Sequence, residues 1–175
     1  RQVRMDPALA GQPSGIEVNA DVPVVVGVRT ELPEDDSGAR EFAHTAATGP
    51  LTGPAIVPLT RNQEDVRSSL VLNALSRESA RAEVVLLRPD GREAASFEVK
   101  IPGGGTVEKR LPRPKGVDRY SVIVIPLKGK IAGARVQVEE TDDGPLIASW
   151  PLTTSPTTTV RPVTSADLGV PFAGR

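Results

Sequence analysis

Hydrophobic and polar residues alternate along much of this chain, with the period of two that an extended strand shows when one face is buried and the other meets water. The clearest case is Phe97, Val99 and Ile101, which alternate with Glu98 and Lys100. The same pattern predicts strands at residues 70–75, 82–87, 107–111, 120–125 and 131–138. In the amino-terminal third, strands are expected at residues 15–20, 22–30 and 41–45.

Turn signals separate these strands. Pro89-Asp90-Gly91 and the stretch 102–105 combine a fixed proline dihedral with glycines that tolerate positive φ. The segments 84–87 and 122–125 are apolar on both faces, which places them in the centre of a sheet. Only residues 62–68 and 78–82 have a helix-friendly composition, and both are too short for more than a turn or so. Strands at this spacing predict an all-β fold, an antiparallel β-sandwich of the immunoglobulin-like (Ig-like) kind.

The two ends of the chain also resemble each other. Residues 26–29 (Val-Gly-Val-Arg) align without a gap on residues 132–135 (Ala-Gly-Ala-Arg), and the downstream acidic turns 34–38 and 140–144 align as well. Self-similarity of this kind predicts a tandem repeat. We therefore expect residues 1–60 to be the carboxyl-terminal strands of an incomplete first module, residues 61–164 a complete sandwich, and residues 165–175 a flexible tail. The chain is accordingly expected to be a piece of a longer protein.

An incomplete module has unpaired strand edges. The amino-terminal strands either pack on the second module as extra strands or mediate dimerisation. We favour the first, because residues 48–59 are too short to separate the two parts. A monomer or a weak homodimer is expected.

Charge and composition exclude several classes of function. With a net charge of −1, the chain has no excess of basic residues of the kind that nucleic-acid binding needs. No apolar run approaches the length of a membrane helix, so membrane insertion by this piece is not expected. The chain has no cysteine, which rules out disulfides, thiol catalysis and thiolate metal sites. With aromatic residues at 3%, the core is expected to consist of valine, leucine, isoleucine and alanine.

No residue pattern indicates an enzyme. His44 is the single histidine, and the repeat alignment equates it with Trp150, which favours a packing or strand-surface role over catalysis. The acidic turns 34–38 and 140–144 lack the ligand spacing of a calcium loop. Gly103-Gly104-Gly105 precedes a strand rather than a helix, so it is a hairpin loop and not a phosphate cradle. We expect no catalytic residue, no cofactor and no metal.

Aromatic residues give the remaining candidate surface. Trp150 and Tyr120 could stack on a sugar ring, although a tryptophan in a β-sandwich more often belongs to the core. Trp150, Tyr120 and His44 are the candidate ligand-surface residues.

Several segments together resemble a known repeat. They are Leu70-Val71-Leu72-Asn73, Ala82-Glu83-Val84-Val85, Pro89-Asp90-Gly91, Ile101-Pro102-Gly103-Gly104 and Ile131-Ala132-Gly133-Ala134. In these segments the chain resembles an uncharacterised family of exported proteins from high-GC Gram-positive bacteria, with tandem β-modules. The resemblance covers most of the chain and implies a location outside the cytoplasmic membrane, either secreted or anchored through a segment that this chain does not include. It supplies no enzymatic residues.

Three hypotheses follow, in order of preference. The first is a non-enzymatic interaction or scaffolding module of the bacterial cell envelope, with an envelope protein or glycan as partner. The second is a carbohydrate-binding module for envelope polysaccharide, which requires an exposed Trp150. The third is an enzyme with paired carboxylates, for instance Glu34 or Asp36 with a partner across a groove.

Overall fold

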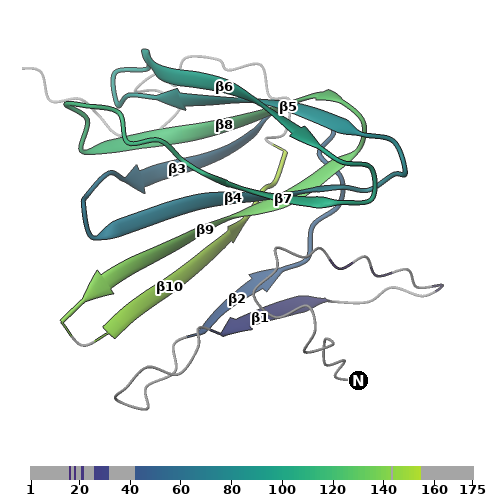
Figure 1. Ribbon diagram of the computed structural model, residues 1–175, viewed down its shortest axis with the longest axis horizontal. Helices are drawn as coiled ribbons and strands as arrows, with labels where there is room; N and C mark the ends of the chain where they lie inside the picture. Colours follow the sequence, from purple (N-terminus) through teal and green to yellow (C-terminus); the bar gives the residue numbers. More distant parts are fainter. Residues whose placement is uncertain are drawn as a thin grey trace, which may run out of the picture.

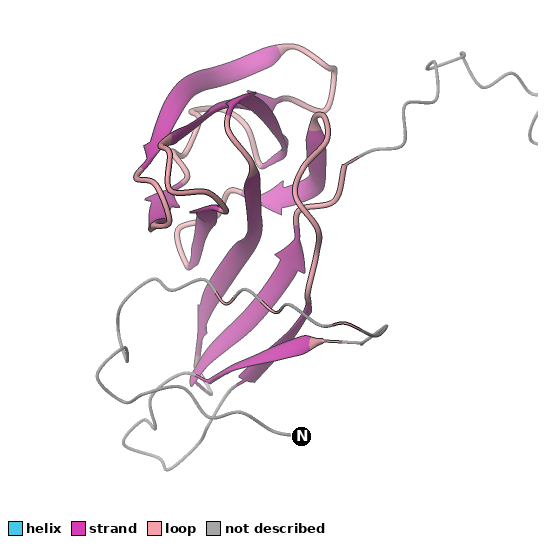
Figure 2. Ribbon diagram, turned by 90° about the vertical axis from the view of Figure 1, so that its right-hand side faces the viewer, coloured by secondary structure: helices cyan, strands magenta, loops and turns pink. Residues whose placement is uncertain are grey.

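The computed structural model describes residues 26–31, 42–142 and 144–154, together with Ile16, Val18 and Asp21. In this part of the chain it has ten β-strands and no helix (Figures 1 and 2). The strands are β1 (Gly27–Glu31), β2 (Phe42–Ala46), β3 (Ala55–Arg61), β4 (Val66–Ala74), β5 (Ala80–Leu87), β6 (Glu93–Ile101), β7 (Thr106–Arg110), β8 (Arg119–Lys128), β9 (Ile131–Thr141) and β10 (Gly144–Pro151). None of the described residues belongs to a helix long and apolar enough to cross a membrane.

Two four-stranded antiparallel sheets pack face to face. One has the order β10-β9-β4-β7 and the other the order β3-β8-β5-β6 (Figure 1). Alternate residues of β4, β5 and β8 are buried between the sheets, because successive side chains on a strand point to opposite faces. The prediction of an all-β, antiparallel β-sandwich is confirmed. The Ig-like classification stays a prediction.

The core consists almost entirely of aliphatic residues, as the composition suggests. Its fully buried members include Leu70, Leu72, Val84, Val122 and Ile131, and Tyr120 is the one aromatic side chain in the buried cluster. Residues 84–87 and 122–125 lie in β5 and β8, the two central strands of their sheet, as predicted. The predicted turn at Pro89-Asp90-Gly91 forms as well: Gly91 has a φ of 81°, and the Arg92 N–H donates to the Asp90 carboxylate.

The free edge of β10 carries few hydrogen-bond donors. The Leu152 N–H donates to the Gly133 carbonyl, so the even-numbered residues of β10 turn their backbone groups toward β9. Odd-numbered residues then face the free edge, and two of them, Pro145 and Pro151, have no N–H. Proline at an edge strand is a common protection against unwanted strand pairing.

The hairpin of β1 and β2 forms a sheet of its own, and β2 lies beside β10 (Figure 1). Its register matches the sequence repeat: Arg29 lies opposite His44 in the first hairpin, and Arg135 lies opposite Trp150 in the second.

The hydrogen bonds of the two hairpins differ, however. In the first hairpin the Val26 carbonyl accepts from the Ala47 N–H across the pair. Ala132, the residue that the repeat equates with Val26, directs its backbone groups toward β4 instead, since Gly133 bonds to β10. At equivalent positions, the backbone groups thus point into the hairpin in the first case and away from it in the second. The tandem repeat stays a prediction.

The predicted boundary at residue 60 falls inside β3, which pairs with β8 in the sandwich. The division into residues 1–60 and 61–164 stays a prediction. Most of the strand expected at residues 15–20, the acidic turn 34–38 and the tail 165–175 lie outside the described residues. Glu34 and Asp36, either of which the enzyme hypothesis takes as one of its paired carboxylates, lie there too.

Candidate functional site

The inward-facing side of β10 extends an apolar surface to the edge of the sandwich. Leu146, Ala148 and Trp150 alternate along the strand and share this face. Leu146 is 48% exposed and Trp150 is 39% exposed, with β2 in place beside the strand. We call these three residues the β10 patch.

The indole of Trp150 is held by a cation from the neighbouring strand. Arg135 of β9 lies directly opposite Trp150, and its guanidinium carbon is 3.8 Å from the centre of the Trp150 ring. A guanidinium over the face of an indole is attracted by the negative charge of the π system, and this attraction increases when water is excluded. The stack therefore fixes one face of Trp150.

Arg135 itself is buried between the sheets, with only 2% of its surface exposed. One of its terminal nitrogens, Nη1, donates to the Thr60 hydroxyl of β3 over 2.6 Å, and its Nε has no hydrogen-bond partner. Burial lowers the pKa of Arg135 to about 10, because the charged form loses its hydration, and the nearby Tyr120 partly opposes this shift. A buried arginine without a carboxylate partner is unusual in a protein core.

Tyr120 lies on the other sheet, in β8, where it pairs with Thr60 in the register of β3. It is 3% exposed, so the structure places it in the core and not on a ligand surface. Burial raises the pKa of Tyr120 to about 12, and the positive charges of Arg135 and Arg113 reduce the shift.

The ionisation of Tyr120 provides a direct check of this packing. Tyr120 is the one tyrosine of the chain, so the absorbance of phenolate near 295 nm reports it alone. We expect a midpoint near pH 12 in the folded protein and near pH 10 in concentrated urea. Between these values the unfolded chain loses the phenolic proton and the folded chain keeps it, so Tyr120 lowers stability as the pH rises. Arg135 contributes with the opposite sign, since its pKa is lowered on folding. A native midpoint near pH 10 would contradict the buried position.

A polar rim borders the β10 patch. Glu139 of β9 lies opposite Leu146 and forms an ion pair with Arg61 at the end of β3. Gln137 lies opposite Ala148 and is buried, whereas Glu139 is partly exposed. An apolar centre with a polar rim is the usual anatomy of a protein-binding surface.

The sequence-predicted site residues fall in three different places. Trp150 is partly exposed, Tyr120 is buried, and His44 is exposed on β2. Arg135 lies against Trp150 and near Tyr120, so it connects two of the three. Residue types alone do not single out Arg135 and Thr60. The sequence contains one indication of Arg135. It alternates in step with Ile131 and Gly133, so its side chain lies on the face of the strand that should be apolar.

The described residues contain no group of three or more histidine or acidic side chains that could hold a metal ion. In the second of the two acidic stretches, β9 ends at Thr141 and β10 begins at Gly144, and the Thr141 hydroxyl donates to the Gly144 carbonyl across this connection. This agrees with the interpretation of the acidic sequence as a turn.

Comparison with known proteins gives a family and a fold. The model of a family of unknown function, DUF5719, matches residues 2–112. No curated protein matches the chain. The crystal structure of the protein designated Thermotoga maritima 1070 is similar with a TM-score of 0.52 and 12% identity, over 60% of this chain and 96% of that one. At this identity the similarity concerns the fold alone.

Proposed function

The chain belongs to DUF5719, a family of unknown function, and we propose that its β-sandwich is a non-enzymatic interaction or scaffolding module of the bacterial cell envelope, outside the cytoplasmic membrane. The envelope location rests on the sequence resemblance to exported tandem β-modules. The interaction role rests on the β10 patch.

One observation carries the interaction role. Trp150 is a large aromatic side chain that is partly exposed and fixed by a buried guanidinium on one face. Tryptophan, tyrosine and arginine are the residues most enriched among those that dominate binding energy at protein interfaces. A side chain that is already ordered loses less entropy on binding, so a fixed tryptophan gives more affinity than a mobile one.

Replacement of Trp150 tests this role. Binding of an envelope protein by the Trp150→Ala variant should weaken about tenfold or more, since truncation of a central aromatic anchor typically has this effect. Leu127 is 48% exposed at the far end of β8 from Tyr120 and serves as the matched control. The measurement compares the envelope proteins retained by the wild type, Trp150→Ala and Leu127→Ala. If Trp150→Ala retains the same proteins as the wild type, the β10 patch is not the binding surface.

The second candidate is binding of an envelope polysaccharide, and the exposure of Trp150 favours it as well, because a sugar ring can stack on the free part of an indole. Trp150 is the one tryptophan of the chain, so its fluorescence reports the site alone. A saturable change in emission on addition of purified, protein-free envelope glycan would favour this candidate over protein binding.

A further inference from the structure

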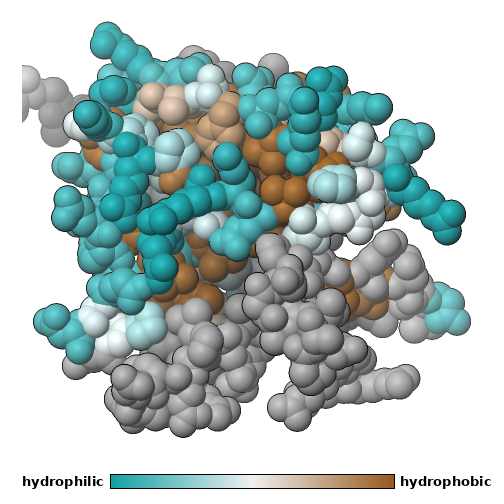
Figure 3. Space-filling model, in the orientation of Figure 1, coloured by the Kyte–Doolittle hydropathy of each residue, from teal (hydrophilic) through white to brown (hydrophobic). Residues whose placement is uncertain are grey.

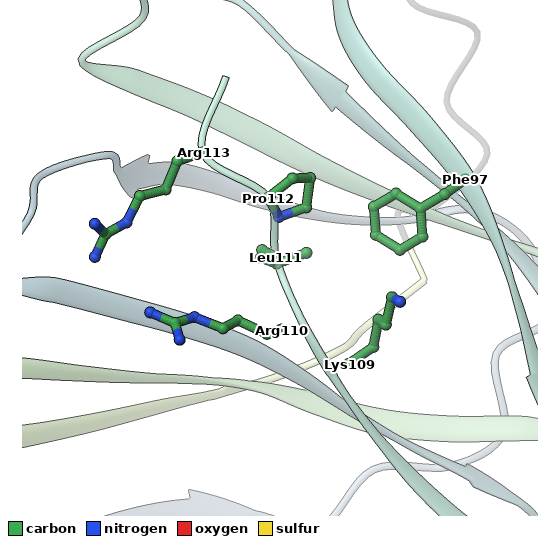
Figure 4. Close-up of a pocket in the computed structure, with 6 residues that line it drawn as sticks. All are labelled: Phe97, Lys109, Arg110, Leu111, Pro112 and Arg113. Atoms are coloured by element: carbon green, nitrogen blue, oxygen red, sulfur yellow. The ribbon is translucent and has the colours of Figure 1, made fainter. Parts of the chain in front are cut away.

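A groove of about 470 Å³ lies on the opposite edge of the sandwich from the β10 patch, between β6 and β7 (Figure 4). It is lined by Phe97 of β6 and by the consecutive residues 109–113 of β7 and the segment after it. Phe97 packs against the hydrophobic core and is half-buried. Hydrophobic side chains gather between β6 and β7 on the face shown in Figure 3, with hydrophilic ones around them.

Three of the lining residues are cations. The amino group of Lys109 lies 5.7 Å from the centre of the Phe97 ring, and Arg110 and Arg113 extend away from it in a common direction (Figure 4). The Arg113 guanidinium donates to the main-chain carbonyls of Glu64 and Val66, which fixes it in place. In the described part of the chain, none of the three cations forms an ion pair with a carboxylate. The groove therefore has a positive charge although the whole chain carries −1.

The backbone of β7 adds a second kind of recognition. The Leu111 N–H donates to the Ser68 carbonyl, and the Ala74 N–H donates to the Gly105 carbonyl, so odd-numbered residues of β7 bond to β4. The N–H and C=O groups of Thr106, Glu108 and Arg110 then point to the free edge. Among the described strands, none pairs with this edge.

We propose that the β6–β7 groove binds an extended acidic peptide segment of a partner protein, which adds as a further strand along the free edge of β7. The peptide backbone pairs with Thr106, Glu108 and Arg110, as in other cases of strand addition to a sheet edge. Its carboxylates meet Lys109, Arg110 and Arg113, and its apolar side chains meet the ring of Phe97. Strand addition gives affinity through the main chain, and the cations select for acidic sequences.

A peptide fits these observations better than an acidic polysaccharide does. Both classes of molecule complement the positive charge, but a polysaccharide has no regular series of N–H and C=O groups to match those of β7. The groove and the β10 patch lie on opposite edges of the same sheet. Either proposal can thus fail while the other holds.

A titration with synthetic peptides tests the inference. The probe is a short, fluorescently labelled peptide of repeated Glu-Glu-Val-Val, which places glutamate and valine on both faces of an extended strand, and its binding is followed by anisotropy at low salt. We expect saturable binding by the wild type. The Lys109→Gln/Arg110→Gln double variant should bind about tenfold more weakly, because each exposed charge pair contributes little by itself but the variant loses two of them. The double variant Lys128→Gln/Lys130→Gln removes the same charge from exposed positions elsewhere and should bind as the wild type does.

Two further peptides separate strand addition from simple charge attraction, and an acidic polysaccharide is the third probe. A peptide with lysine in place of glutamate should not bind. A glutamate peptide methylated on alternate backbone nitrogens, which cannot donate to β7, should bind about tenfold more weakly. The inference is overturned if the glutamate peptide shows no saturable binding, if the methylated peptide binds equally well, if both double variants lose binding alike, or if an acidic polysaccharide binds at Lys109 and Arg110 while the peptide does not.

Discussion

Replacement of Gly133 by alanine is expected to lower the free energy of unfolding by about 3 kcal/mol, the upper end of what an overpacked core position costs. Gly133 lies near the start of β9, where a side chain would be directed at the backbone carbonyl of Val71 on β4. The added methyl group would also come within 2.9 Å of the Leu72 side chain and 3.3 Å of the Leu152 side chain. A carbonyl in a sheet ladder cannot move aside without breaking its own hydrogen bonds.

Urea denaturation, followed by circular dichroism, measures this effect. Gly49→Ala is the matched control, because a methyl group there would have no neighbour within 4 Å. It should leave the denaturation midpoint unchanged or raise it slightly. Equal midpoints for Gly133→Ala and Gly49→Ala would mean that β9 and β4 do not approach each other as described.

Replacement of Arg135 by alanine should have a similar effect, again about 3 kcal/mol, although the cause is different. The variant leaves a cavity between the sheets, removes the hydrogen bond of the Thr60 hydroxyl, and takes away the support of the Trp150 ring. Buried arginines contribute through the packing of their long side chains as well as through charge.

Arg135→Met is the informative companion. Methionine restores most of the volume without a charge that must be desolvated, and such replacements of buried charges are often neutral or stabilising. We expect the stability of this variant to lie within about 1 kcal/mol of the wild type. Methionine provides no cation for the ring, so binding through the β10 patch should still weaken. A stability loss in Arg135→Met as large as in Arg135→Ala would show that the charge itself stabilises the fold.

Much of the sandwich can be predicted from the sequence, because burial of one face leaves an alternating pattern. Phe97, Val99 and Ile101 show it, and they lie in β6. The edge strands β3 and β10 are harder to recognise. Pro58 interrupts the pattern of β3 at a register shift between Val57 and Thr60. Prolines are tolerated at such edge positions and protect them against strand pairing. The same prolines interrupt the alternating pattern, so these strands are difficult to recognise from the sequence.

The site is less predictable than the fold. Residue type singles out Trp150 and Tyr120 equally, yet one is partly exposed and the other is buried. Their difference depends on where the second sheet ends relative to the first, and local sequence does not determine that. The role of Arg135 cannot be predicted from the sequence for a related reason. It depends on the cross-strand pair with Trp150 and on the hydrogen bond to Thr60, a residue far away in the sequence.

The most direct test of the proposed function uses 5-fluorotryptophan in place of Trp150. With one tryptophan in the chain, the labelled protein gives one fluorine resonance, and unlabelled partners are invisible. We predict that envelope proteins shift or broaden this resonance, and that Leu127→Ala behaves as the wild type does. A shift produced by the protein-free glycan alone would support the polysaccharide alternative. If envelope proteins bind the chain and the resonance does not change, the β10 patch is not an interaction surface and the proposed function of Trp150 is wrong.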